Sequence, residues 1–307
     1  MSRRGASPED DRSWVFNRLA GDYRRRPGYS TALAERLLVL AGGPGARVAD
    51  LGAGTGLLAL PLARLGARVH AVEPARAMLA ELAAAPSDGV ELVHAAAEAT
   101  GLPAGAFDLV VLADALQWVD PGRGGREAAR LLAPGGALAV VTPRLADTPF
   151  LSALAARILR ANFKARPPLP PVAQLFAEAG LPPPTEERSH DEALLDAGAL
   201  DAVLRSLSFV GPALGPVALA ALLADARALA AAHGGAVWRR EIALAWGRSG
   251  AAPRRVTVSS GVQPGGPAGL ARPRSASPGD APSASGPLRG RTRSSPRAGR
   301  RTGSRGR

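Results

Sequence analysis

The chain has no cysteine among its 307 residues and few aromatic side chains, which make up 4% of the sequence. Without cysteine it cannot form a disulfide bond, a thiolate metal site or a cysteine nucleophile. Its histidines and carboxylates show no spacing typical of metal ligands, so we expect no bound metal. The hydrophobic share of 46% still allows a sizeable core.

Long hydrophobic runs are also lacking. The most apolar stretch, residues 212–232, contains Asp225 and Arg227, which fits an amphipathic helix better than a membrane span. The first ten residues contain no apolar segment of the secretory type. We therefore expect a cytoplasmic protein with no membrane partner.

Positive charge is concentrated at the end of the chain. The formal net charge is +12, but residues 251–307 hold 12 arginines and a single acid, Asp280, so the rest of the chain is close to neutral. From residue 249 onward the sequence is rich in Pro, Gly, Ser, Ala and Arg and has almost no large apolar residue. We expect residues 249–307 to form a disordered basic tail, and residues 1–11 to be disordered as well.

Short apolar segments alternate with helical patterns from residue 47 onward, which predicts an α/β fold. We expect a Rossmann-like, doubly wound and mostly parallel sheet with helices on both faces. Its strands are expected at 47–51, 68–72, 90–94, 107–112 and 137–142, and its helices at 14–20, 31–40, 55–65, 75–84 and 124–132. Extra C-terminal helices are expected at 145–164, 171–180, 199–208 and 217–233, with a strand near 186–190 and a closing strand at 237–246.

A glycine-rich turn follows the first expected strand. Asp50 precedes Gly52, Gly54 and Gly56, which gives the spacing G-x-G-x-G, and the second strand ends at Glu73. Glycines let the backbone approach a ligand at φ values that other residues resist. A carboxylate that closes the second strand can accept hydrogen bonds from both hydroxyls of a ribose. The third glycine comes one residue too early for a dinucleotide-binding turn, and an acid at position 50 suits a cationic amino group better than a phosphate.

Several other segments occur in a recognisable order. They are YRRRPGY (23–29), AGTG (53–56), AVEP (71–74), AEATGLP (97–103), FDLV (107–110), ALQW (115–118) and LAPGG (132–136). Together they resemble the class I S-adenosylmethionine-dependent methyltransferases with a type 11 domain. RSLS (205–208) and ALAW (243–246) are similar to a small-molecule subgroup that includes trans-aconitate methyltransferase-like proteins.

The resemblance implies a cofactor-binding core over residues 12–144 and, in the same domain, a substrate side over residues 145–248. The implied cofactor is S-adenosyl-L-methionine, which leaves as S-adenosyl-L-homocysteine. Its binding residues would be Tyr23, Arg26, Asp50, Gly52, Ala53, Gly54, Gly56, Glu73, Pro74, Ala97, Glu98 and Asp114.

Each part of the cofactor has an implied partner. Asp50 and the glycine turn would hold the methionine end, and Glu73 the ribose. Ala97 and Glu98 would lie against the adenine. Tyr23 and Arg26, together with Tyr29, would belong to an N-terminal lid.

Asp114, Gln117 and Trp118 are the candidate catalytic residues. Family members commonly have His-Trp where this chain has Gln117-Trp118, and glutamine does not titrate near neutral pH, so an imidazole base is lacking there. A sulfonium methyl is already activated, so its transfer mainly needs positioning and exclusion of water. A hydroxyl or amine acceptor would need Asp114, or a histidine such as His190 or His233, to take a proton, whereas a carboxylate acceptor would need no base.

The leading hypothesis is methyl transfer to a small molecule, with oxygen favoured over nitrogen as the acceptor. Residues 113–116 lack the Asp/Asn-Pro-Pro-aromatic turn that holds nucleobase amino groups in other methyltransferases. Arg144, Arg157 and Arg205 are candidate anchors for an anionic substrate. One alternative is an RNA methyltransferase that uses the arginine tail as an electrostatic arm, although the tail has no aromatic residue for base stacking. Another is a non-catalytic module that only binds the cofactor.

Overall fold

The computed structural model describes residues 15–85, 88–163 and 172–250. Residues 1–11, which were expected to be disordered, lie outside these ranges, and so does almost all of the expected basic tail.

The described chain alternates helices and strands, as expected. Its first part contains α1 (Val15–Tyr23), α2 (Thr31–Ala41), β1 (Arg47–Leu51), α3 (Ala59–Arg64), β2 (Arg68–Val72), α4 (Arg76–Ala83), β3 (Val90–Val93) and β4 (Phe107–Ala113). A 3-10 helix, η1 (Leu116–Trp118), then precedes α5 (Pro121–Leu131) and β5 (Leu132–Leu145). The last part contains α6 (Pro149–Ala161), α7 (Val172–Glu178), β6 (Thr185–Leu195), α8 (Ala197–Ser206), α9 (Pro216–Ala232) and β7 (Ala236–Arg248).

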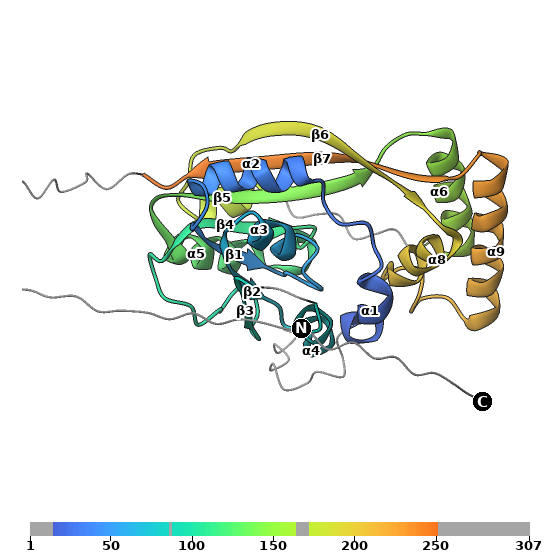
Figure 1. The fold of residues 1–307 in the computed structure, drawn as a ribbon, viewed down its shortest axis with the longest axis horizontal. Helices are drawn as coiled ribbons and strands as arrows, with labels where there is room; N and C mark the ends of the chain where they lie inside the picture. Colours follow the sequence, from blue (N-terminus) through green and yellow to red (C-terminus); the bar gives the residue numbers. More distant parts are fainter. Residues whose placement is uncertain (1–14, 86–87, 164–171, 251–307) are drawn as a thin grey trace, which may run out of the picture. The chain divides into compact units, whose positions relative to one another are not determined.

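These strands form one sheet with the order β3-β2-β1-β4-β5-β7-β6 (Figure 1). The strands β1 to β5 pair in parallel, whereas β7 runs antiparallel to both β5 and β6. The predicted Rossmann-like, mostly parallel sheet is confirmed. The strand order reverses between β1 and β4, and ligands of such sheets bind at the carboxyl ends of the strands beside that point.

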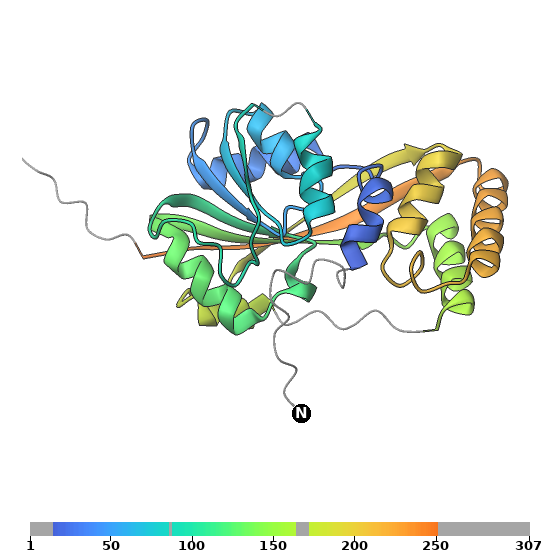
Figure 2. The ribbon, with the colours of Figure 1, turned by 90° about the horizontal axis from the view of Figure 1, so that it is seen from below.

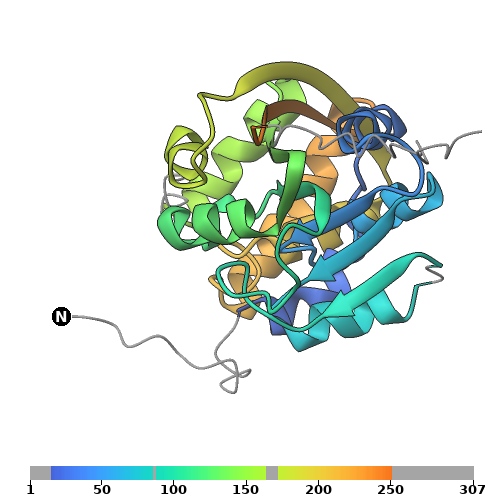
Figure 3. The same cartoon turned by 90° about the vertical axis from the view of Figure 1, so that its left-hand side faces the viewer.

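Helices cover both faces of the sheet (Figure 3). On one face, α2 and α3 bury Leu37 and Leu62 against β1, β4 and β5, and on the other, α5 and α7 bury Leu131 and Phe176. A third apolar cluster joins α6, α8 and α9 to the first residues of β7, including Trp238. Figures 1 and 2 place these three helices at the carboxyl end of β5, past the edge of the parallel strands.

Several bounds differ from the sequence prediction, and three of these differences matter for the fold. The helix expected from residue 55 begins only at Ala59, because Gly56 has a left-handed φ of +84° and continues the turn. β5 spans Leu132–Leu145 instead of the expected 137–142, so it begins at the residue expected to end the preceding helix, and its register with β4 shifts there. β6 spans 11 residues instead of the expected five, because every residue from Thr185 to Leu195 pairs with β7 despite a polar composition of low strand propensity.

Glu127 connects α5 to the segment that follows β3. Its Oε1 accepts hydrogen bonds from the backbone N–H and the hydroxyl of Thr100, at 2.9 and 2.6 Å. Arg130 donates to both carboxylate oxygens, at 2.7 and 2.8 Å. The hydrogen bond from Arg130, followed by those from Thr100, lowers the pKa of Glu127 to about 2 even though burial opposes this.

We predict that Glu127→Gln lowers the free energy of unfolding at pH 7 by about 2–3 kcal/mol. The lowered pKa of Glu127 stabilises the folded protein at pH values above the unfolded-state value of 4.5, and this stability is lost as the pH falls toward 2. The difference in unfolding free energy between the wild type and the variant should therefore be smaller at pH 3. Urea unfolding at both pH values measures it. Glu178→Gln is the control, because its ion pair with Arg126 is exposed and should contribute less than about 1 kcal/mol. Equal losses in the two variants would contradict the prediction.

Candidate active site

The glycine turn brings backbone N–H groups to the carboxyl end of the sheet. Gly52 has a φ of +79°, and a Cβ atom there would lie 2.7 Å from the Cβ of Ala115, so a side chain at this position would be strained and crowded. Gly54 donates its N–H to Oε2 of Glu73 at 2.9 Å. The turn that follows β1 is therefore joined directly to the residue that follows β2.

Glu73 is buried, with 6% of its surface exposed. In addition to the bond from Gly54, its Oε1 accepts the N–H of Ala75 at 2.9 Å. Burial raises the pKa of Glu73, although these two hydrogen bonds act against the rise. Each carboxylate oxygen is thus held in place and keeps a lone pair for a further donor.

Asp50 is 1% exposed, and neither of its carboxylate oxygens has a hydrogen-bond partner among the described residues. Burial, followed by the charge of Glu73, raises the pKa of Asp50 to about 7. An unpartnered buried carboxylate is costly, and groups perturbed in this way concentrate at functional sites.

A pocket opens over this turn. It is lined by Phe16, Tyr23, Gly52, Gly54, Glu73, Pro74, Met78, Ala96, Ala97, Glu98, Asp114, Ala115, Trp118 and Val119. Most of the predicted cofactor residues are among them. Asp50 at the end of β1 and Ala53 and Gly56 in the turn do not line the pocket. Arg26 lines the space next to it.

Two aromatic rings narrow this pocket. Phe16 meets Trp118 edge-on, with 5.0 Å between the ring centres, and the free space inside is about 70 Å³, well below that of a typical ligand site. Phe16 could not be singled out from the sequence, because its position in an amphipathic helix looks like that of any core residue. Glu98 uses its carboxylate elsewhere, accepting the N–H of Asp120 at 2.9 Å.

A second, larger cavity of about 500 Å³ lies between the end of β5, the start of β7, and helices α6 and α8. Its walls are mainly apolar and include Ile158, Leu159, Val203, Leu207, Phe209 and Trp238. Its polar lining residues are Arg26, Asp114, Arg144, Asn162 and Arg240. Of the expected arginine anchors only Arg144 lines this cavity; Arg157 and Arg205 do not. The candidate bases His190 and His233 do not line it either.

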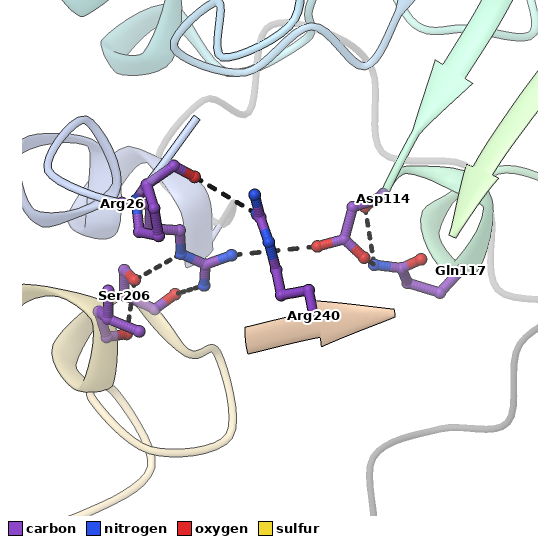
Figure 4. A network of polar contacts seen from close by, with 7 residues as sticks. Arg26, Asp114, Gln117, Ser206 and Arg240 are labelled. Carbon is purple, nitrogen blue, oxygen red and sulfur yellow. Dashed lines mark hydrogen bonds and ion pairs between the residues drawn. The ribbon is translucent and has the colours of Figure 1, made fainter. Parts of the chain in front are cut away.

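Asp114 lies where the two spaces meet, since it lines the pocket, the cavity and a narrow space between them. Among the described residues it is the one non-glycine residue with a positive φ, +49°. Such strain persists where the surrounding structure enforces it, often at active sites. Gln117 enforces it in part, because its Nε2 donates to the carbonyl oxygen of Asp114 at 2.9 Å and to Oδ1 at 3.3 Å (Figure 4).

Two arginines fix the segment that leads from α1 to α2. Arg26 donates from Nε and Nη2 to the hydroxyl and carbonyl oxygens of Ser206, at 2.6 and 2.8 Å, and its guanidinium lies 4.0 Å from the ring centre of Tyr23. Arg240 forms two 2.7 Å bonds with Asp191 and donates to the carbonyl oxygen of Gly28 at 2.6 Å. Arg240 could not be selected from the sequence, because it looks like one charge among several on a strand.

Tyr29 lies on this same segment, beneath the guanidinium of Arg240, which is 5.2 Å from its ring centre. Burial, followed by the charge of Asp114, raises the pKa of Tyr29 well above 10, so its hydroxyl keeps its proton at neutral pH. It can donate a hydrogen bond but cannot act as a base.

Residues 49–140 match a protein-family model described as a methyltransferase domain. The chain is 42% identical over 132 residues to an uncharacterised methyltransferase of Mycobacterium tuberculosis, covering 43% of this chain and 53% of that protein. It is 41% identical over 103 residues to a ubiquinone biosynthesis O-methyltransferase of Caulobacter sp. (strain K31), covering 32% of this chain and 41% of that one.

Solved structures of other methyltransferases are also similar to this chain. A candidate type II methyltransferase from Anaeromyxobacter dehalogenans is 28% identical with a TM-score of 0.50, and the match covers 74% of this chain and 99% of that one. A candidate methyltransferase from an antibiotic biosynthesis pathway of Anabaena variabilis has the same fold, with 20% identity and a TM-score of 0.52 over 72% of this chain and 99% of its own. Residues 49–140 of the chain therefore form a methyltransferase domain.

The chain spans about half the length of the curated relatives that it matches first. Within residues 15–85, 88–163 and 172–250, no helix has the length and apolar character that crossing a membrane requires. Across the same ranges, no group of three or more His, Asp or Glu side chains is arranged to hold a metal ion.

We predict that Asp50→Asn stabilises the ligand-free protein at pH 8 by about 3 kcal/mol. Because the pKa of Asp50 is raised, the wild-type protein loses stability as the pH rises from the unfolded-state value of 3.8 to about 7. Asparagine carries no charge at any of these pH values, so the variant does not lose this stability. Urea unfolding at pH 5 and pH 8 should show the gain mainly at pH 8. Asp225→Asn, on the exposed side of α9, is the control and should change little at either pH. A gain that does not depend on pH would refute this origin.

Proposed function

We propose that this chain is an S-adenosylmethionine-dependent methyltransferase that methylates a hydroxyl oxygen of a small molecule. The observation that carries the proposal is the position of Asp114, between a pocket built on the glycine turn and a separate, mainly apolar cavity. A group-transfer enzyme needs two binding spaces that meet at the reacting atoms.

Two carboxylates fit the proposed cofactor: Glu73, which lines the pocket, and Asp50, which lies just before the glycine turn. The unpartnered, buried carboxylate of Asp50 suits the ammonium group of the methionine part, because the cation would pair with its charge. The two oxygens of Glu73, already oriented by backbone N–H groups, suit the two hydroxyls of the ribose. When bound, the cofactor supplies a methyl group activated by a positively charged sulfur.

Cofactor binding requires the pocket to widen. Phe16 and Trp118 close it to about 70 Å³, so one or both rings must move for an adenosine group to fit. Phe16 belongs to α1, and Tyr23 at the end of the same helix also lines the pocket. We therefore assign to α1 the role of a lid that closes over the cofactor and excludes water.

Asp114 takes up the acceptor proton in this proposal. Gln117 fixes the direction of its carboxylate, and the apolar walls of the cavity keep water from the transferring methyl group. The ubiquinone biosynthesis O-methyltransferases among the relatives support oxygen as the acceptor atom. The core at residues 12–144, the substrate side at 145–248, membership of the small-molecule subgroup and a cytoplasmic location belong to the same proposal.

We predict that Glu73→Gln weakens binding of S-adenosylhomocysteine by about 1–2 kcal/mol, because one ribose hydroxyl would lose its charged acceptor. Isothermal titration calorimetry at pH 7.5 measures the affinity, with circular dichroism to show that the variant is folded. Glu91→Gln, on the exposed side of β3, is the matched control and should bind as the wild type does. If folded wild-type protein fails to bind at millimolar ligand, the proposed function is wrong.

A further inference from the structure

We propose that Arg26 and Asp114 together bind the acceptor oxygen, and that the acceptor is a phenol or enol with an apolar body. This inference rests on the proposed function of the same site. It assigns Arg26 to the acceptor instead of the cofactor, with which the sequence resemblance associated it.

The guanidinium of Arg26 is held so that one of its nitrogens faces Asp114. Nε and Nη2 are bound to Ser206, which is fully buried and donates its own hydroxyl to the carbonyl oxygen of Val203 at 2.7 Å. Nη1 remains directed at Oδ2 of Asp114, 4.0 Å away (Figure 4). Both side chains are largely buried, with 17% and 20% exposed.

The separation of 4.0 Å between these two charged groups is too long for a direct hydrogen bond. It is short enough for one oxygen atom to lie within hydrogen-bond distance, about 2.8 Å, of both. Arg26 and Asp114 both line the large cavity, and both also line the narrow space between that cavity and the pocket. The gap between them therefore belongs to the acceptor side of the site.

The carboxylate of Asp114 needs a hydrogen-bond donor and the guanidinium of Arg26 needs an acceptor, and a hydroxyl group can be both. Its proton is donated to Asp114, one lone pair accepts from Arg26, and the second lone pair attacks the methyl carbon. As the oxygen–carbon bond forms, the carbon–sulfur bond breaks, its electron pair stays on sulfur, and the hydroxyl proton moves to the Asp114 carboxylate. The products are the methyl ether, S-adenosylhomocysteine and protonated Asp114.

An amine or a carboxylate in the same place would satisfy only one of the two residues. A neutral amine has a single lone pair, which cannot accept from Arg26 and attack the methyl group at the same time. A carboxylate has no proton to give and is repelled by Asp114. Arg26 also favours the negative charge that develops on the oxygen, and this favours hydroxyls of phenols and enols over those of alcohols.

Arg240 does not compete for this role. Its guanidinium is bound to both oxygens of Asp191 and to the carbonyl oxygens of Pro27 and Gly28. The rest of the cavity is lined mainly by apolar side chains such as Val203, Phe209 and Trp238, so the body of the acceptor is apolar.

Three probes with the same ring system test the inference: 2-naphthol, 2-naphthylamine and 2-naphthoate. Their affinities are measured by fluorescence with wild-type protein saturated with S-adenosylhomocysteine. We expect 2-naphthol to bind roughly tenfold more tightly than either of the others, since only it satisfies both partners. Equal affinities, or preference for the amine or the acid, would overturn the inference.

Variants of Arg26 and Asp114 should shift the pKa of bound 2-naphthol in opposite directions. Absorbance titration of 2-naphthol on the protein gives the pKa of its hydroxyl, which Arg26→Gln should raise and Asp114→Asn should lower, because they remove charges of opposite sign. The other charged or titratable side chains around this space are the same in both variants; they are Tyr23, Tyr29, Arg144 and Arg240. Shifts in the same direction, or none, would contradict the assignment.

Two further variants separate this effect from a loss of structure. Ser206→Ala removes one anchor of Arg26 and should weaken 2-naphthol binding less than Arg26→Gln does. Arg157→Gln is the matched control: Arg157 lies on α6, donates to the carbonyl oxygen of Ala153 and does not line the cavity, so naphthol binding should not change.

The same proteins titrated with S-adenosylhomocysteine distinguish the two proposals. If Arg26→Gln weakens binding of this ligand and leaves 2-naphthol unaffected, Arg26 serves the cofactor and the inference is wrong while the proposed function stands. If the wild type does not bind S-adenosylhomocysteine at all, the proposed function itself fails.

Discussion

The burial of two carboxylates at the ends of neighbouring strands is the constraint on which the site depends. Asp50 belongs to β1 and Glu73 follows β2, and the parallel register between these strands brings both acids to one edge of the sheet. Burial of both raises their pKa values, and the charge of Glu73 adds to the rise at Asp50. Glu73 is stabilised by two backbone N–H groups, whereas Asp50 has no such partner among the described residues. A cation that binds next to Asp50 would relieve this cost, which links the affinity of the pocket to the instability of the ligand-free state.

The second half of the site depends on the long antiparallel strands. β5 and β7 extend past the carboxyl ends of β1 and β4 and carry helices α6, α8 and α9 with them (Figure 1). The resulting apolar cavity meets the pocket at Asp114, whose strained backbone is held by Gln117 and by a bond to the carbonyl oxygen of Val141. Two arginines hold the segment between α1 and α2 in place. Arg26, on this segment, binds Ser206 of α8. Arg240 of β7 binds the backbone of the segment at Gly28. The two binding spaces are thus connected by a few polar contacts, and the charge of those contacts decides which acceptor group fits between them.

Much of the fold could be predicted because its signals are local. The strands β1 and β2 have the predicted bounds, since short apolar runs next to glycine and acidic residues indicate buried parallel strands. The start of α5 was predicted three residues late, although Asp120 and Pro121 form a recognisable helix start. The length of β6 could not be predicted, because it depends on cross-strand pairs such as Asp191 with Arg240 that join residues far apart in the chain. The same limit applies to the arginine anchors: Arg157 and Arg205 looked equivalent to Arg144 in the sequence, and only Arg144 lines the cavity.

By itself, the sequence determined the sheet with its helices, the glycine turn, the acid in β1 and the acid that follows β2. Each of these is encoded by residue type and by spacing within about 25 positions. Only the tertiary structure decided that Arg26 faces Asp114, that Phe16 lies over Trp118, and that Arg240 holds the backbone at Gly28. These contacts join residues that are from about 90 to more than 200 positions apart. Their geometry follows from how α1, α8 and β7 pack around the end of the sheet, and no local pattern of side chains records that packing.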